Sequence, residues 1–136
     1  MSPKEVVKAF YTSDLANNSQ LVSKYVHKDC QLHWNSSTGY KVLDYDGLDE
    51  FYKNVNLSYN SLKCEISHLL QDQNHVTIRF TVFISTIEDP ENEQPLANFI
   101  SIWEVKDGKL YRGYELSQVA DDNIESYKSF SEIKVQ

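Results

Sequence analysis

The sequence predicts a single α+β domain in which helices come first along the chain and a sheet follows. Before Asn60, three segments carry apolar residues every three or four positions, which is the period of a helix. From Asn60 onward the period changes to two, as in strands. Helices followed by consecutive strands are typical of helices laid on one face of an antiparallel sheet. At 136 residues the chain can bury one core.

Three helices are predicted in the first part of the chain. Ser2, Pro3 and Glu5 form a capping box with proline at the first helical position, and we expect this helix to end near residues 17–18. Ser19 is expected to cap a short second helix. The third helix opens at Asp46-Gly47 and carries its apolar residues on one face: Leu48, Phe51, Tyr52 and Val55.

Strands are predicted between and after these helices. Residues 27–35 alternate, so Trp34 shares a face with Cys30 and Leu32, while His33 and Asn35 point the other way. A short strand over 41–45 follows. Four long antiparallel strands then close the domain, at about 60–70, 76–84, 96–105 and 109–119, and Asp107-Gly108 supplies the last hairpin turn. The domain thus spans 1–120, and the tail 121–136 has the pattern of one more short helix.

Composition and charge narrow the classes of partner. The net charge of −7 argues against nucleic acid or an anionic membrane surface. The first residues lack the features of a signal peptide, and no apolar stretch approaches the length of a membrane span, so we expect a cytoplasmic protein. Cys30 and Cys64 are expected to be reduced, buried thiols. No cysteine or histidine spacing indicates a metal site, and no motif indicates a cofactor.

Three stretches carry a resemblance to a known superfamily: "VVKAFY" with the helix and strand after it, "YDGLDEFY", and "FISIWEVKDGKLYRGYEL". Over residues 3–119 the chain resembles the nuclear transport factor 2-like superfamily, which includes the SnoaL-like polyketide cyclases and the steroid Δ-isomerases. The resemblance implies a cone, in which a strongly curved antiparallel sheet wraps around the N-terminal helices (a cystatin-like roll). It also implies a pocket open at one end, and a homodimer through the outer sheet face.

The resemblance assigns faces to the strands. On the steroid isomerase pattern Phe10 takes the place of the oxyanion-hole tyrosine, Trp34 that of the aspartate base, and Ser101 that of the protonated aspartic acid, so that enzyme's mechanism is disfavoured. The residues expected to face the pocket are Phe99, Ser101, Trp103, Tyr111, Gly113, Glu115 and Ser117. Those expected on the outer face, as the dimer surface, include Arg79, Phe83, Ile100, Glu104, Arg112 and Tyr114, with Arg79 and Glu104 as a cross-strand pair.

Glu115 is the principal candidate for catalysis. A carboxyl that faces a pocket loses hydration, its pKa rises, and it becomes suited to acid-base chemistry near neutral pH. His68 is its expected partner, because its neighbours Ile66 and Leu70 share an apolar strand face. Three alternatives stay open. A register shift of one residue would turn Glu115 outward, or Glu115 would belong to a purely structural ion pair. Independently of both, His68 would be an ordinary core histidine.

The remaining candidates are residues for binding a flat, apolar ligand. Trp34 and Trp103 are expected to form aromatic walls, although plain core packing explains them equally well. The other expected contacts are polar: Asn35, Tyr45, Ser101, Tyr111 and Ser117. Two functions therefore remain open. One is a pocket protein with cofactor-independent acid-base chemistry of the isomerase, cyclase or hydratase kind. The other is a non-catalytic, dimeric binding or scaffold module with a filled core.

Overall fold

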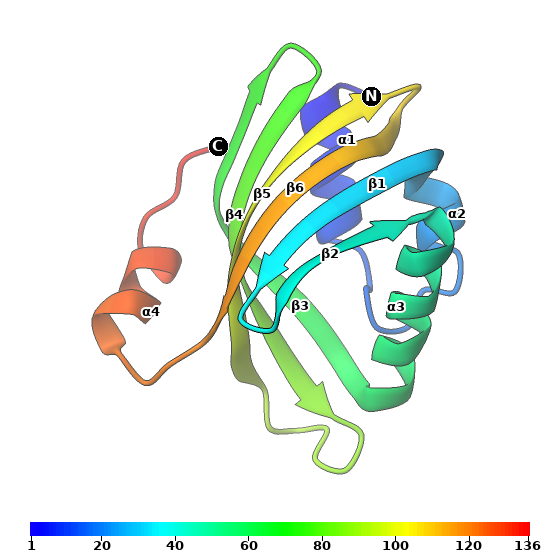
Figure 1. The fold of residues 1–136 in the computed structure, drawn as a ribbon. Helices are drawn as coiled ribbons and strands as arrows, with labels where there is room; N and C mark the ends of the chain where they lie inside the picture. Colours follow the sequence, from blue (N-terminus) through cyan, green and yellow to red (C-terminus); the bar gives the residue numbers. More distant parts are fainter.

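The structure, a computed structural model, describes all 136 residues and confirms the α+β fold (Figure 1). Its elements in chain order are α1 (Pro3–Tyr11), α2 (Leu21–Tyr25), β1 (Val26–Ser36), β2 (Gly39–Asp44), α3 (Tyr45–Ser58), β3 (Tyr59–Asp72), β4 (His75–Thr86), β5 (Gln94–Lys106), β6 (Lys109–Val119) and α4 (Ile124–Ser131). The six strands form one sheet in the order β2-β1-β6-β5-β4-β3. None of the helices is long and apolar enough to cross a membrane.

The sheet is strongly curved, and its concave side holds α1, α2 and α3 (Figure 1). All strand pairs are antiparallel except β1 with β6, which run parallel. The hairpin between β5 and β6 turns at Asp107 and Gly108, both with positive φ, as the Asp-Gly pair predicts. This arrangement places the inner faces of all six strands opposite the helices.

The predicted capping box at the start of α1 is present, with Ser2 and Glu5 each accepting a hydrogen bond from the backbone of the other. The predicted end of this helix was wrong, because α1 stops at Tyr11. The hydroxyls of Thr12 and Ser13 donate to the carbonyls of Lys8 and Phe10, which competes with further helical turns. Helix α2 starts after Gln20.

The core lies between the helices and the concave face of the sheet. Trp103 is its largest fully buried side chain, and it packs directly over Gly113 of the neighbouring strand. A Cβ atom at Gly113 would lie 2.7 Å from Cζ3 of Trp103 and 2.7 Å from Cδ1 of Leu32. Glycine is therefore required here because the indole approaches the backbone of β6 too closely for any side chain.

The strand pairings contain five shifts of register, and two of these bear on the predicted site. The register of β3 shifts between Ile66 and His68, and that of β6 shifts beside Tyr111, since Glu104 pairs with Arg112 but Val105 pairs with Leu110. Each is one extra residue in one strand, the pattern of a β-bulge. A bulge reverses which residues face inward on one side of it, and both bulges alter the predicted site.

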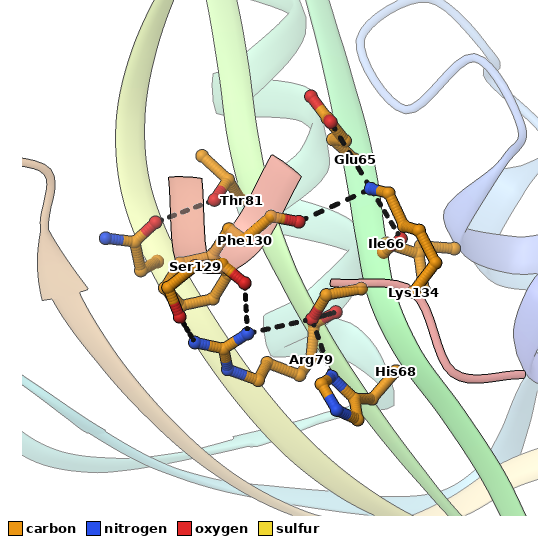
Figure 2. A network of polar contacts seen from close by, with 10 residues as sticks. Glu65, Ile66, His68, Arg79, Thr81, Ser129, Phe130 and Lys134 are labelled. Carbon is orange, nitrogen blue, oxygen red and sulfur yellow. Dashed lines mark hydrogen bonds and ion pairs between the residues drawn. The ribbon is translucent and has the colours of Figure 1, made fainter. Parts of the chain in front are cut away.

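The tail after residue 120 folds back over the convex face, where α4 lies against β3 and β4 (Figures 1 and 2). The Arg79 guanidinium stacks on the Phe130 ring at 3.6 Å and donates to Oγ of Ser129 at 2.8 Å. Val135 continues as a short parallel bridge beside His68 on β3. The expectation that helices cover only one side of the sheet was therefore wrong.

The expected cross-strand pair of Arg79 and Glu104 does not form. The register places Arg79 opposite Ile100, and the tail engages its guanidinium instead. Phe83, expected in the dimer surface, packs edge-on against Tyr127 of α4. The part of the convex face that stays uncovered lies on β5 and β6, with Ile100, Ile102, Tyr114 and Leu116 each more than two-fifths exposed.

Candidate functional site

A cavity of about 430 Å³ opens between the concave face of the sheet and helices α1 and α3. Of its 29 lining residues, 22 are hydrophobic, so the space suits a ligand with an apolar body. Ser36 at the end of β1, and Ser37 and Thr38 in the turn that follows, also border it. Glu115 is the only lining residue with a charged type of side chain.

Aromatic rings form much of the wall. Phe80 and Phe99 stack in parallel planes, with centroids 5.1 Å apart, on neighbouring strands. Trp34 packs edge-on against Phe51 of α3 at 5.5 Å, and its Nε1 donates a 2.9 Å hydrogen bond to Oγ of Ser117. These contacts hold the rings in fixed orientations, so that they present flat surfaces to whatever enters.

Glu115 lies on β6 with its side chain toward the cavity, the orientation that alternation along the strand predicts. It is only 7 % exposed, and burial raises the pKa of its carboxyl to about 7. A hydrogen bond that Ser101 donates to Oε1 over 2.7 Å acts in the opposite direction and lowers the pKa. Both the protonated and the ionised form are therefore populated near neutral pH.

The second carboxyl oxygen of Glu115 is open to the cavity. Ser101 supplies the only hydrogen bond that the protein makes to this carboxyl, and that bond occupies Oε1. No fully enclosed side-chain oxygen in the protein lacks a partner, so the free oxygen Oε2 must border open space. Ser101 itself is fully buried behind Glu115 and positions the carboxyl without lining the cavity.

Two tyrosines at the cavity were not among the sequence candidates. The Tyr11 hydroxyl accepts a 2.8 Å hydrogen bond from Nε1 of Trp103, and its own proton has no acceptor in the protein. The Tyr52 hydroxyl has no hydrogen-bond partner in the protein, and its oxygen is not fully enclosed by protein atoms. Burial, followed by the nearby Glu115 carboxyl, holds both tyrosine pKa values well above their usual range, so both hydroxyls remain proton donors. In the sequence, the only sign of these hydroxyls is that each apolar helix face carries a tyrosine, whose hydroxyl needs a polar partner when it is buried.

Cys64 also lines the cavity but is not a candidate nucleophile. Burial, and to a smaller extent Glu115, raises the pKa of its thiol to about 12, so the thiolate is scarce at neutral pH. Both cysteines are free. No group of three or more His, Cys, Asp or Glu side chains is arranged to hold a metal ion.

The expected pairing of His68 with Glu115 was wrong. The bulge in β3 places His68 opposite Arg79, so both side chains lie on the convex face, and Leu69 turns inward in its place (Figure 2). The His68 ring is 2.9 Å from Oγ of Ser67, in the polar network that anchors the tail. It therefore lies on the far side of the sheet from the cavity.

The other expected binding residues divide into two groups. Trp34, Trp103 and Ser117 line the cavity. Three do not: Asn35, Tyr45 and Tyr111. Asn35 is exposed on the opposite strand face, and the ring of Tyr45 lies under the Lys28 ammonium at 4.3 Å. Tyr111 is displaced by the bulge in β6, which turns Leu110 inward in its place. Its ring instead lies under the Arg112 guanidinium and packs edge-on against His27.

Together the fold and the cavity define a class of protein: a cone-shaped α+β domain with an apolar interior and a single buried acid. Residues 7–113 match the sequence profile of the SnoaL-like domain, and the chain belongs to that family. No curated protein matches the chain by sequence.

Solved structures share the fold at low sequence identity. IdmH of Streptomyces antibioticus, a candidate polyketide cyclase, aligns with a TM-score of 0.66 at 13% identity over 91% of this chain and 94% of its own. A phenazine biosynthesis-related protein of Pseudomonas aeruginosa gives 0.66 at 16% identity, covering 98% and 87%. TerC, crystallised with polyporic acid, gives 0.60 at 18% identity, covering 96% and 99%. At these identities the likeness concerns the fold.

Proposed function

We propose that this protein binds a planar, largely apolar small molecule in its cavity and performs acid-base chemistry on it with Glu115. One observation carries the proposal: a carboxyl with a pKa of about 7 turns a free oxygen into an apolar cavity of about 430 Å³. The structural relatives in polyketide and phenazine biosynthesis, and the one crystallised with polyporic acid, are consistent with a ligand of this kind.

The open cavity favours this function over a non-catalytic scaffold. A scaffold needs a stable core, and a filled interior serves that purpose better than an open one. A buried acid also costs stability, which a purely structural core avoids by using an apolar residue. Here the acid has one hydrogen bond and a free oxygen instead of a compensating cation. A destabilising buried acid of this kind is typical of a functional site.

The chemistry follows from the positions of three side chains. As a carboxylate, Glu115 takes a proton from a carbon next to a ligand carbonyl, and the C–H electron pair moves onto the carbonyl oxygen. The free hydroxyl protons of Tyr11 and Tyr52 are available to hydrogen-bond that developing oxyanion. The protonated Glu115 then returns its proton to another atom of the ligand, which completes an isomerisation or assists ring closure.

Deuterium exchange into 2-tetralone, a bicyclic ketone with acidic C–H bonds beside its carbonyl, tests this function without knowledge of the natural ligand. We expect the wild-type protein to accelerate the exchange, followed by proton NMR in D₂O, and Glu115→Gln to reduce the acceleration by about a hundredfold. His68→Ala is the matched control and should behave as wild type. Exchange at the buffer rate, or equal rates for Glu115→Gln and wild type, would contradict the proposal.

For assembly we propose a homodimer through the uncovered part of the convex face, on β5 and β6. Ile100, Ile102, Tyr114 and Leu116 give this surface a set of large apolar side chains that water would otherwise cover. A two-fold contact would bury the same set on both copies. We also retain the expected cytoplasmic location, with which two free thiols are compatible.

A further inference from the structure

One row of residues on a shared sheet face crosses three adjacent strands beside the cavity, and the exposed Lys41 at its end is not itself a lining residue. Glu115 on β6 pairs with Trp34 on β1, and Trp34 pairs with Lys41 on β2. Neighbouring strands lie about 4.8 Å apart, so the backbones at the two ends of this row are separated by about 10 Å. The row therefore has an acid at one end, a flat indole in the middle and a cation at the other end.

Lys41 belongs to the concave face of the sheet although it is charged. Its side chain shares a face with Leu43, which lines the cavity, while the intervening Val42 is exposed on the opposite face. Its Nζ lies 4.4 Å from the centroid of the Trp34 ring and 5.9 Å from that of Phe51. Both rings line the cavity, so the ammonium is held beside the cavity wall.

The ammonium of Lys41 has no ion-pair or hydrogen-bond partner in the protein. It has no carboxylate within ion-pair distance and donates no hydrogen bond, whereas Lys53, Lys63 and Lys134 are each paired with an acid. No other lysine or arginine lies over a ring that lines the cavity. An anionic group of a bound ligand can therefore gain a partner here without breaking an existing ion pair or hydrogen bond.

We propose that the cavity selects planar aromatic carboxylates, with the ring system on Trp34, the carboxylate at Lys41 and a hydroxyl or carbonyl oxygen toward Glu115. This inference deepens the proposed function and rests on it. An anion next to Glu115 would be repelled whenever that acid is ionised, which leaves the Lys41 end for the charge. The two ends of the row thus determine the orientation of the bound ligand.

The test uses two fluorescent probes with the same ring system, one anionic and one neutral: 6-hydroxy-2-naphthoate and its methyl ester. Dissociation constants are measured by fluorescence titration at about pH 6, where Glu115 is mainly protonated. Wild-type protein should bind the carboxylate more tightly than the ester. Lys41→Met, which keeps the side-chain stem over Trp34, should weaken carboxylate binding about fivefold and leave ester binding unchanged.

Two matched variants sharpen the result. Lys53→Met removes an exposed ammonium from α3 and should bind both probes as wild type does. Lys41→Arg keeps the charge and should retain the preference for the carboxylate. Equal loss of both probes in Lys41→Met would mean that Lys41 acts through packing on Trp34, and would overturn the inference. So would an unchanged preference, which would mean that Lys41 only shields the edge of β2.

The outcomes separate this inference from the function on which it rests. If wild type accelerates exchange into 2-tetralone in a Glu115-dependent manner but shows no preference for the carboxylate probe, only the inference about ligand charge fails. If the Glu115-dependent exchange is absent, the proposed chemistry fails, whatever the probes do. A carboxylate preference that depends on Lys41 would still support the row as a binding site.

Discussion

The Glu115 carboxyl receives its one hydrogen bond from Ser101, whose Oγ lies 2.7 Å from Oε1. The two residues are directly opposite each other on β6 and β5. Ser101 is fully buried, so the bond is shielded from water and fixes which oxygen faces the cavity.

The carboxyl of Glu115 should make the protein less stable as pH rises. Its pKa is about 7 in the folded state and about 4.5 in the unfolded state, so between these values only the folded state holds the proton. Stability from this group is complete below about pH 4.5 and is lost as pH approaches 7, by up to about 3 kcal/mol. Denaturant unfolding of wild type and Glu115→Gln over this range should reveal the loss as a changing difference. A constant difference would contradict the raised pKa.

Ser101→Ala should raise the pKa of Glu115 above its wild-type value. The Ser101 hydroxyl stabilises the ionised carboxyl, and alanine leaves that form without a donor. A carbon-13 NMR titration of the glutamate side chains measures the change directly. Ser117→Ala is the control, because that hydroxyl serves Trp34 and not Glu115. A pKa that stays the same or falls in Ser101→Ala would show that another group holds the carboxyl.

Gly113→Ala should destabilise the protein by about 1–3 kcal/mol, because the new Cβ would meet Trp103 and Leu32 at 2.7 Å inside a packed core. The free energy of unfolding from a urea titration measures this cost. Gly47→Ala is a milder control, since its nearest atom is 3.2 Å away on the flexible side chain of Asp44. Equal stabilities of the two variants would mean that Trp103 moves aside freely.

Ile102→Glu should convert the proposed dimer into a monomer. Ile102 is 44% exposed on the uncovered convex face, and a carboxylate there would lose its hydration in a two-fold contact. Sedimentation equilibrium measures the mass of each variant. Leu57→Glu, at an exposed site on α3, should leave the mass unchanged. A monomeric wild type, or a dimer that tolerates Ile102→Glu, would rule out this interface.

Arg79→Met should release the C-terminal tail while the domain stays folded. Methionine keeps an apolar stem near Phe130 but removes the hydrogen bonds to Ser129 and Ser67 (Figure 2). Hydrogen–deuterium exchange should become faster across residues 124–135 and stay slow in β4 and β5. Arg112→Met, which alters a guanidinium elsewhere on the sheet, should not affect the tail. Unchanged exchange in Arg79→Met would mean that Lys134 and the Val135 bridge are enough to hold the tail on the sheet.

The sequence by itself determined the local structure and much of the face assignment. The capping box at Ser2, the Asp-Gly hairpin turn and the change of period at Asn60 each act through neighbouring residues, so they can be recognised without a fold. The inward orientation of Glu115 follows from alternation along β6, in a regular part of the hairpin where Ser101 pairs with Glu115. The resemblance then supplied the curved sheet around the helices.

Only the tertiary structure decided the partners of Glu115. One extra residue in β3 turned His68 outward, and one in β6 removed Tyr111, because a single inserted residue reverses a strand's faces and leaves little mark in an alternating sequence. Tyr11 and Tyr52 converge on the cavity from separate helices. Lys41 lines up with Glu115 because β1, the hairpin partner of its strand, pairs with β6 from the far end of the chain. Such neighbours arise from the pairing and packing of whole elements, which local pattern does not specify.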